Sequence, residues 1–380
     1  MRRWLFAIGL LVSLLALAAC AAKEKATPTP PTPGAEVKPA WEQEWERVLA
    51  AAKREGKVTT VGPTGEPGRR VLTEPFERKY GISVEYLTAQ GPEFVPRLRA
   101  EREAGQYLWD VFVGGQTVPF DFKALSALDP LEPALITPEV KDGKNWVRGQ
   151  LPFIDKDHTA LTMSRNMSML WFINTSLVKP EEFKSFRDLL DPKWKGKILA
   201  FDPRISGAGR SQFAFYYLHK DLGPDFVRAL LRQDITISRD YRQAAEWLAQ
   251  GRFPILLGGD RLAVTPLAKE GLPVIQIDPR QIKEGGPVYA GWGSVALFNK
   301  APHPNAAKVY LNWLLSKEGQ TEFSRVFEYA SWRADVPMDD LSPGLRPQES
   351  YFAPYGEAEI TEYIKAQATA TNIAKEILGE

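Results

Sequence analysis

Short apolar segments that run into glycine-containing loops alternate along this chain with longer segments whose apolar residues recur at helical spacing. The clearest short segments are Lys57–Val61, Trp109–Val113, Lys197–Phe201 and Phe253–Leu257. Strands that alternate with helices favour βαβ units and a mainly parallel sheet. The pattern therefore predicts an α/β fold.

The units fall into two groups, and a chain of 380 residues is long enough for two domains. Apolar segments at Ser164–Asn174 and Gly291–Asn299 connect the groups, and the amphipathic stretch His303–Ser316 would return the chain to the first. We expect two lobes, each a mainly parallel sheet flanked by helices, with a ligand cleft between them. The expected bounds are residues 41–164 plus about 299–345 for lobe 1, and residues 165–298 plus about 346–380 for lobe 2. A helix over Glu357–Leu378 should support one lobe.

The N-terminus has the features of an export signal. Arg2 and Arg3 precede an apolar run that ends in Leu-Ala-Ala-Cys at Cys20, the only cysteine of the chain. This resembles the lipobox of bacterial lipoprotein signal peptides, which implies cleavage after residue 19 and lipid on Cys20. We expect an exported protein that is lipid-anchored to the outer face of the cytoplasmic membrane, in a periplasm or at the cell surface. The alternative is an uncleaved membrane anchor.

Residues 20–40 predict a disordered linker, because prolines, threonines and lysines dominate them and large apolar side chains are scarce. The chain holds 48 Lys and Arg against 47 Asp and Glu, and loss of Arg2 and Arg3 with the leader would keep it near neutrality. No basic surface is therefore expected to attract nucleic acid. The predicted mature protein is a monomeric body on a tether.

Candidate ligand contacts lie where predicted strands end, because loops at the carboxyl ends of strands form the binding edge of such sheets. Helix starts there also attract anions. The candidates are Thr64, Gly65, Glu66, Gln116, Thr117, Ser164, Ser206, Gly207, Gly209, Arg210, Arg239, Asp260, Arg261 and Trp292.

Each candidate has a purely structural alternative. Arg239 could form a surface ion pair with Asp240, Asp260 could only cap a helix, and Trp292 could only pack at a lobe crossing. If Arg210 and Arg239 converge, their guanidinium groups could bind a phosphate, phosphonate or carboxylate group.

Several stretches together are similar to family 1 extracellular solute-binding proteins of ABC importers, in the branch named for ferric-iron-binding proteins. They are GPTGEPGRR, LTEPFERKYGISVEY, WDVFVGG, LLDPKWKGKILAFDPR and GSVALFNKAPHPNAAKVYLNWLLSKEGQ. The resemblance covers roughly residues 41–330. It implies a two-lobe clamshell of the type II kind that captures a solute and passes it to a membrane permease with its ATPase.

The iron ligands of that branch are not matched. Its ferric-binding members typically carry an adjacent tyrosine pair after the strand that corresponds to Phe253–Leu257, where this chain has Gly258-Gly259-Asp260-Arg261. Tyr216 and Tyr217 are adjacent but belong to an apolar helix, which favours core packing. We therefore expect an anionic or oxygen-rich organic ligand, with Fe³⁺ and a bound anion as the alternative.

Two other functional classes are alternatives for this sequence. They are a lipid-anchored hydrolase and a ligand-sensing partner of a membrane receptor. The sequence has no G-x-S-x-G, H-E-x-x-H or P-loop motif, and the S-x-x-K match at Ser176–Lys179 has no K-T-G partner. His158, His219 and His303 lack the spacing of metal ligands. The sequence predicts a binding protein without a cofactor rather than an enzyme.

Overall fold

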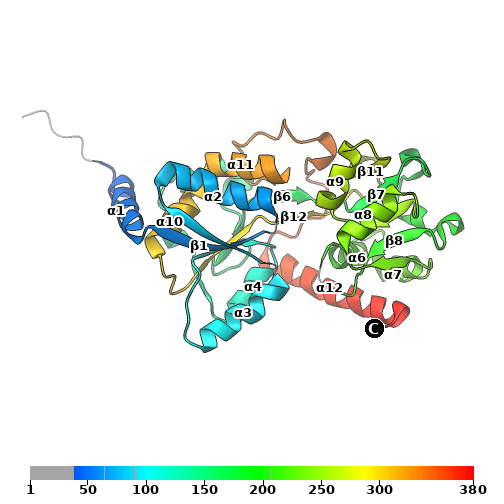
Figure 1. Cartoon of the computed structure of the whole chain (residues 1–380), viewed down its shortest axis with the longest axis horizontal. Coiled ribbons are helices and arrows are strands. Elements are labelled where there is room, and N and C mark those ends of the chain that lie inside the picture. Colours follow the sequence, from blue (N-terminus) through cyan, green and yellow to red (C-terminus); the bar gives the residue numbers. More distant parts are fainter. Residues whose placement is uncertain (1–37, 64, 90, 206) are drawn as a thin grey trace, which may run out of the picture. The chain divides into compact units, whose positions relative to one another are not determined.

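Two mixed sheets and a small connecting sheet organise residues 38–63, 65–89, 91–205 and 207–380, which this computed structural model describes (Figure 1). The first large sheet and its helices form lobe 1, the second large sheet and its helices form lobe 2, and the small sheet forms the hinge.

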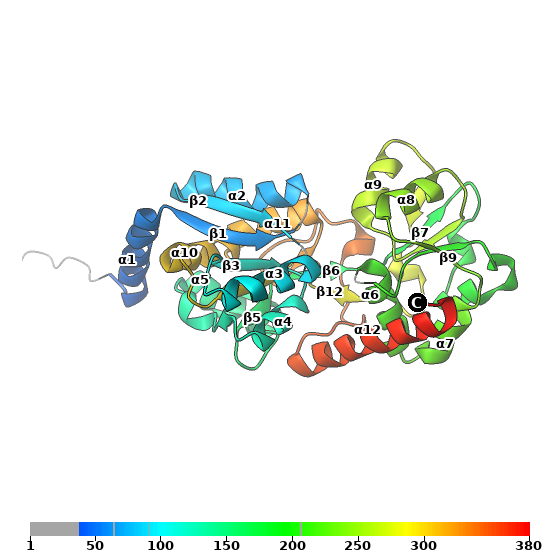
Figure 2. The ribbon, with the colours of Figure 1, turned by 60° about the horizontal axis from the view of Figure 1, so that its bottom comes forward.

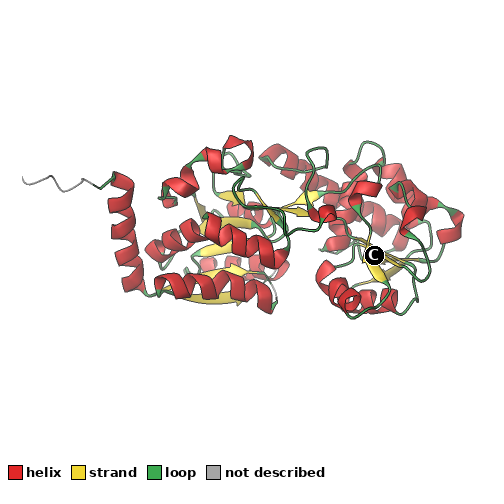
Figure 3. Ribbon diagram, turned by 90° about the horizontal axis from the view of Figure 1, so that it is seen from above, coloured by secondary structure: helices red, strands yellow, loops and turns green. Residues whose placement is uncertain are grey.

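Lobe 1 has the strand order β2-β1-β3-β13-β4, and β5 also pairs with β13. Its strands are β1 (Lys57–Gly62), β2 (Ser83–Thr88), β3 (Val111–Gly114), β4 (Leu128–Asp129), β5 (Ala160–Thr162) and β13 (Ser294–Phe298). Its helices are α1 (Ala40–Glu55), α2 (Glu66–Tyr80), α3 (Gly91–Glu103), α4 (Val118–Ala124), α5 (Pro138–Lys141), α10 (Pro304–Leu314) and α11 (Lys317–Phe327). Figure 3 shows strands of this lobe lying between helices.

Lobe 2 has the strand order β11-β7-β10-β8-β9. Its strands are β7 (Trp171–Asn174), β8 (Ile198–Phe201), β9 (Thr236–Ser238), β10 (Ile255–Leu257) and β11 (Val274–Gln276). Its helices are α6 (Ala208–Leu218), α7 (Gly223–Leu231), α8 (Tyr241–Ala249) and α9 (Arg261–Lys269), and the last helix of the chain is α12 (Glu357–Leu378). Short 3₁₀ helices occupy Glu132–Ala134, Gly143–Asn145, Val147–Gly149, Pro180–Glu182, Phe186–Leu190, Pro192–Trp194, Pro279–Gln281 and Pro343–Leu345.

The hinge sheet has β6 at its centre, with β12 and β14 antiparallel on either side. These strands are β6 (Ser164–Met167), β12 (Val288–Tyr289) and β14 (Ala330–Ser331). β6 leads into β7 of lobe 2 and β12 leads toward β13 of lobe 1, at or next to the two crossings that the sequence predicted, whereas β14 lies between residues that pack in lobe 1. β14 is only two residues long, so it leaves little hydrophobic pattern to detect.

Both large sheets are mixed, because in each of them one strand runs against all the others. β1 is parallel to β2 and β3, but β13 is antiparallel to β3. β8 is parallel to β9 and β10, but β7 is antiparallel to β10. β7 and β13 are the strands that enter a sheet directly after crossing the hinge, and each therefore runs against its neighbours. Residues 294–298 thus belong to the sheet of lobe 1, although the boundary expected near residue 299 places them in lobe 2.

Both faces of the central strands are buried, which explains why these strands are apolar without a polar alternation. In β3, Val111 and Val113 pack on one side and Phe112 on the other. In β8, Leu199 joins one core while Ile198 and Ala200 join the opposite one. Helices must cover both faces, so the strand ends are left for the loops.

Helix α12 contacts both lobes rather than the single lobe expected (Figure 2). At its start, Ile360 packs in a core cluster of lobe 1, and the Glu357 carboxylate accepts a hydrogen bond from the Lys156 N–H at 3.0 Å. Farther along, Ile373 joins a lobe 2 core, and Glu376 pairs with Arg228 at 2.8 Å. No helix within the described ranges is long and apolar enough to cross a membrane.

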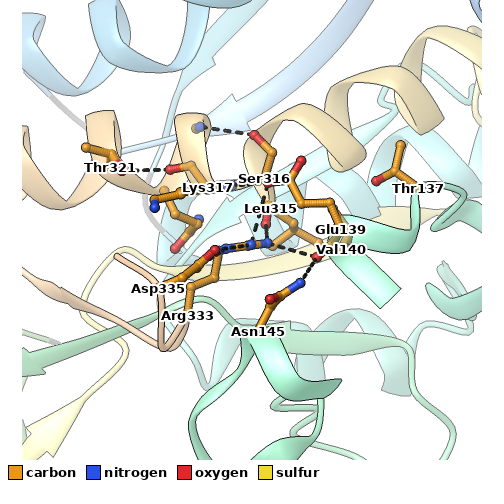
Figure 4. A network of polar contacts seen from close by, with 12 residues as sticks. Thr137, Glu139, Val140, Asn145, Leu315, Ser316, Lys317, Thr321, Arg333 and Asp335 are labelled. Carbon is orange, nitrogen blue, oxygen red and sulfur yellow. Dashed lines mark hydrogen bonds and ion pairs between the residues drawn. The ribbon is translucent and has the colours of Figure 1, made fainter. Parts of the chain in front are cut away.

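A buried arginine fastens the segment after β14 to lobe 1 (Figure 4). Arg333 is 1% exposed, and its Nε and Nη2 donate to the two oxygens of Asp335, each at 2.8 Å. Its Nη1 donates to the carbonyl oxygens of Glu139 and Leu315, at 3.2 and 3.1 Å. A buried charge needs such partners, because an unpaired one would be strongly destabilising.

Candidate functional site

The sequence candidates in the hinge have structural partners. Ser164 is buried, and its hydroxyl donates to the Ala290 carbonyl at 2.6 Å. A side chain at Gly293 would meet that hydroxyl, since a Cβ atom there would lie 1.8 Å from it. Trp292 packs against the core of lobe 1. Ser164 and Trp292 therefore have roles in packing the hinge that need no ligand.

Gln116 links lobe 1 to the hinge. It follows β3 and is buried, and its side-chain oxygen accepts a hydrogen bond from the Ala290 N–H at 2.7 Å. Its buried Nε2 has no hydrogen-bond partner among the described residues. Thr117 precedes α4 without capping it through its side chain. This end of β3 therefore offers one buried amide donor.

The loop after β1 approaches α11. Gly65 begins α2 with φ 96°, a conformation that favours glycine, and Glu66 is the first helical residue. One turn on, Gly68 lies against the Phe327 ring, which a Cβ atom would approach to 3.0 Å. Thr64 lies outside the described residues, so the structure does not place this candidate.

In lobe 2, the start of α6 is packed closely against the sheet. A Cβ atom on Gly209 would lie 2.2 Å from the Phe201 carbonyl, and one on Gly258 would lie 2.7 Å from the Gly209 Cα. Gly209 is therefore needed for helix–sheet packing whether or not a ligand binds there. Ser206, the candidate before it, lies outside the described residues.

Tyr241, which is not among the sequence candidates, caps this helix. The Tyr241 ring stacks on Phe201 with centroids 3.8 Å apart, and its hydroxyl accepts a hydrogen bond from the Ala208 N–H at 2.7 Å. Burial raises the pKa of Tyr241 to about 12, so the phenol stays neutral. Gly207, with φ 140°, has no room for a side chain because a Cβ atom would lie 2.5 Å from that hydroxyl. An anion at this helix start would have Tyr241 beside it.

Arg210 lies in the first turn of α6 and is half-buried. Its Nε is buried without a hydrogen-bond partner, and no carboxylate among the described residues pairs with its guanidinium. Burial raises the pKa of Tyr363 on α12, and the nearby positive charge of Arg210 opposes that rise. Tyr363 is one helical turn after Ile360, which packs on lobe 1. Arg210 is therefore an unneutralised cation of lobe 2 near the boundary with lobe 1.

Arg239 does not converge with Arg210 on a shared site. Its Nε donates to the buried carboxylate of Asp202 at 2.7 Å, and Arg204 donates to both oxygens of the same group. Burial alone would raise the pKa of Asp202, but the hydrogen bonds from these two arginines outweigh it, and the net pKa is lowered. Arg239 thus forms an ion pair, as the structural alternative anticipated, but with Asp202 rather than Asp240.

Asp260 and Arg261 lie at the start of α9, and they act in different ways. The Asp260 carboxylate accepts from the Leu262 N–H at 2.9 Å and so caps the helix, and burial raises its pKa. Arg261 reaches lobe 1, where its Nη2 donates to the Phe327 carbonyl at 2.7 Å and its Nη1 lies 3.5 Å from the Glu328 carboxylate. Arg261 is thus a direct polar link between the lobes.

Replacing Arg261 by alanine should loosen the contact between the lobes. The side chain is only 13% exposed, and a hydrogen bond from a charged donor contributes about 1.5 kcal/mol, or roughly a tenfold change in population. We expect the radius of gyration from small-angle X-ray scattering to increase in the ligand-free protein. Arg242→Ala removes the same charge from an exposed position on α8 and should leave it unchanged. Identical scattering for R261A and wild type would show that Arg261 does not hold the lobes together.

Three of the sequence candidates, taken together, share one property. Gln116, Arg210 and Arg261 each hold a buried nitrogen donor that lacks a hydrogen-bond partner. They come from lobe 1, from the start of α6 and from the start of α9. Buried donors normally find an acceptor, so this set suits a ligand rich in oxygen atoms.

The aromatic residues around these donors were missed in the sequence. Tyr241 follows directly on Arg239 and Asp240, and Tyr329 contacts the Arg261 guanidinium, whose carbon lies 5.8 Å from the ring centroid. Tyr289 of β12 packs on Tyr363 with ring centroids 4.8 Å apart. Single tyrosines at these positions carry no motif, and only the fold brings them to the lobe boundary.

Two surface cavities lie elsewhere, and neither includes a sequence candidate. One, of about 570 Å³, lies on lobe 2 and is lined by residues such as Lys184, His219 and Tyr351. The other, of about 480 Å³, lies on lobe 1 beside Lys57, Tyr86 and His303. We place the candidate site at the lobe boundary instead, because Gln116 is bonded to the hinge and Arg261 reaches the other lobe.

The described residues contain no group of three or more His, Cys, Asp and Glu side chains suited to a metal ion. Tyr216, which could supply a phenolate, is buried in the lobe 2 core and contacts Phe186 and Phe226. The prediction that Tyr216 is a packing residue is confirmed. Burial also raises its pKa, which disfavours the phenolate form.

Comparisons with solved structures agree with this two-lobe arrangement. Iron-bound HitA from Pseudomonas aeruginosa has a TM-score of 0.65 at 18% identity and covers 83% of this chain and 99% of its own. AfuA from Actinobacillus pleuropneumoniae, with fructose-6-phosphate bound, has a TM-score of 0.62 at 18% identity and covers 85% and 98%. IdiA (FutA) from Trichodesmium, with iron and citrate, has a TM-score of 0.60 at 18% identity and covers 86% and 100%. At this identity the likeness shows the periplasmic-binding-protein fold.

Sequence comparison identifies the family. An uncharacterized protein of Haemophilus influenzae is 27% identical over 267 residues, which make up 65% of this chain and 69% of the relative. The family model for bacterial extracellular solute-binding proteins matches residues 72–343, which is well over half of the chain. The protein therefore belongs to the bacterial extracellular solute-binding proteins, a family that binds solutes for import rather than transforming them.

Proposed function

We propose that this protein captures a small anionic or oxygen-rich organic solute between its lobes and delivers it to an ABC permease. The supporting observation is the pair of buried, unpartnered donors on Gln116 of lobe 1 and Arg210 of lobe 2. Phosphate, phosphonate or carboxylate oxygens would satisfy them, and Arg210 would supply the neutralising charge. The phosphate-bearing ligand of AfuA is of this class.

Donors from different lobes would bind one ligand only when the lobes are close together. A ligand that contacts both lobes stabilises that arrangement by its differential affinity for it. The hinge sheet, with β6 between β12 and β14, provides the connection about which the lobes would move. Capture and release would therefore be coupled to lobe closure.

The test is to identify the solute directly. Native mass spectrometry of the purified protein, followed by a thermal-shift panel, should reveal a ligand that raises the melting temperature by mass action. The panel should include sugar phosphates, phosphonates, di- and tricarboxylates and matched neutral sugars. The proposal fails if only neutral solutes raise the melting temperature, or if the bound solute is chemically altered on incubation.

Ferric ion with a bound anion is the second candidate, because iron is bound in HitA and IdiA. Fe³⁺ prefers oxygen donors, and Tyr241 and Tyr329 are phenols whose pKa values rise through burial and, in addition, through the charge of Asp260. Burial raises the pKa of each tyrosine to about 12, so a metal would have to displace a firmly held proton. Ferric citrate should produce a coloured protein if tyrosinate ligands form, and a colourless, iron-free sample would exclude this mode.

We also propose export and lipid anchoring at Cys20, which lies outside the described residues. Cys20→Ala should move the protein from the membrane fraction to the soluble extracytoplasmic fraction, because alanine has no sulfur atom to which the lipid could be attached. The measurement is cell fractionation with intact-mass analysis of the N-terminus. Ser13→Ala, within the same leader, is the matched control and should stay membrane-bound. Unchanged fractionation of C20A would instead support an uncleaved anchor.

A further inference from the structure

Two arginines meet at the hinge without a counter-charge. The Arg148 and Arg165 guanidinium carbons lie 5.8 and 5.3 Å from the centroid of the same ring, that of Trp332. Arg148 also lies over the Tyr355 ring at 4.4 Å, and the two rings form an edge-to-face pair 4.6 Å apart. Like charges so placed repel each other unless an anion is present.

The acidic groups of this region are engaged elsewhere. Asp335 pairs with Arg333, and Glu359 accepts hydrogen bonds from the N–H groups of Tyr355 and Gly356 at the start of α12. No carboxylate among the described residues lies within 4.0 Å of either Arg148 or Arg165. Arg333 directly follows Trp332 in the chain, and all of its guanidinium nitrogens have hydrogen-bond partners. Arg148 and Arg165 differ from it in having no carboxylate partner.

Arg165 is the more buried member of the pair. Its Nε donates to the Ser331 carbonyl at 3.0 Å and its Nη2 contacts the Met338 sulfur at 3.8 Å, which leaves Nη1 without a partner among the described residues. Burial lowers the pKa of Arg165, and the charge of Arg148 lowers it further. Buried cations are normally paired with an anion.

Arg148 is exposed and adopts φ 73°, in the left-handed region that side chains other than glycine rarely occupy. The backbone strain at this residue accompanies the placement of its guanidinium over Tyr355. Together the two arginines offer several N–H donors, held by aromatic rings and open to solvent on the Arg148 side.

This cluster is separate from the proposed solute site. Ser164 and Arg165 are successive residues of β6, so their side chains project from opposite faces of the hinge sheet. Ser164 donates to the Ala290 carbonyl and Gln116 accepts from the Ala290 N–H, whereas Arg165 faces Trp332.

We propose that Arg148 and Arg165 form a second binding site, for a small oxyanion such as phosphate, sulfate or a carboxylate, on the hinge sheet. Two guanidinium groups suit the several oxygens of such an ion, and its negative charge would remove their mutual repulsion. Because β6 connects the lobes, the ion would bind at the joint between them.

The test is calorimetric titration of the purified full chain with inorganic phosphate, sulfate and citrate in turn, with chloride replacing them at constant ionic strength. At least one probe should bind, and Arg148→Ala should weaken its binding about tenfold or more. Arg148 is exposed, so this variant should fold normally. Arg165→Lys, which keeps the charge but loses the forked donors, should also weaken binding.

Two controls separate this site from general effects and from the solute site. Arg242→Ala removes an equal charge from an exposed helix and should bind the probe as wild type does. Arg210→Ala should likewise leave this binding intact. The inference is overturned if no probe binds, if R148A titrates like wild type, or if R210A alone abolishes binding. The last result would support the solute site while removing this one.

Sulfate and phosphate also stabilise proteins by exclusion from their surfaces, so melting temperatures need the same comparison. The rise in melting temperature with the bound probe should be larger for wild type and R242A than for R148A. An equal rise in all three proteins would show a general salt effect and would contradict the site.

Discussion

Replacing Arg210 by alanine is expected to weaken solute binding by about 10- to 100-fold, which corresponds to roughly 1.4–2.8 kcal/mol. The variant removes a half-buried cation that has no carboxylate partner and whose Nε lacks an acceptor. Losing it would leave the negative charge of the ligand uncompensated at the lobe boundary. Calorimetric titration with the solute identified by mass spectrometry is the direct measurement.

Arg239→Ala is the matched control, because it removes the same side chain from the same lobe. Arg239 is already paired with Asp202 and is 60% exposed, so its loss should change solute affinity less than about threefold. Far-ultraviolet circular dichroism should show that both variants are folded. If R239A loses affinity while R210A keeps it, the roles assigned to the two arginines must be exchanged.

Replacing Arg333 by alanine is expected to destabilise the fold by about 3–5 kcal/mol. The change removes a buried cation and leaves the Asp335 carboxylate, which is 33% exposed, and the carbonyls of Glu139 and Leu315 without their donor. The melting temperature should fall by roughly 5–10 °C. Arg325→Ala, which breaks an exposed ion pair with Glu322 on α11, should shift it far less.

The pH dependence of this loss tests the ion pair itself. Hydrogen bonds from Arg333 lower the pKa of Asp335 in the folded protein. A lowered folded pKa contributes stability above the unfolded pKa, near 3.9, and that contribution is lost as the pH falls through the folded value. The difference in unfolding free energy between wild type and R333A should therefore narrow as the pH falls below about 4. A constant difference would assign the effect to the carbonyl contacts alone.

Local pattern was sufficient for most elements of the fold. The helix expected at residues 357–378 is α12 with the same bounds. Strand directions were not recoverable, because β7 and β13 are as apolar as their parallel neighbours. Apolarity reports burial on both faces, and it carries no information about which end of a sheet a strand enters.

The candidate residues illustrate a second limit. Arg210 and Arg239 looked equivalent in the sequence, since each follows a strand of lobe 2. Only Arg239 has Asp202 within reach, and that carboxylate is 37 positions away in the chain. Arg261 likewise looked like a ligand contact, but the fold places it against Phe327 and Glu328 of the other lobe.

The sequence by itself determined the α/β class, the family and the set of loops that could meet a ligand, because these depend on local periodicity and on contiguous motifs. The tertiary structure decided which side chains already have partners and which remain free. That distinction separates Arg210 from Arg239 and Arg261, and it separates the Arg148–Arg165 pair from Arg333. Neutralisation of a charge depends on distances between residues far apart in the chain, and only the folded structure sets those distances.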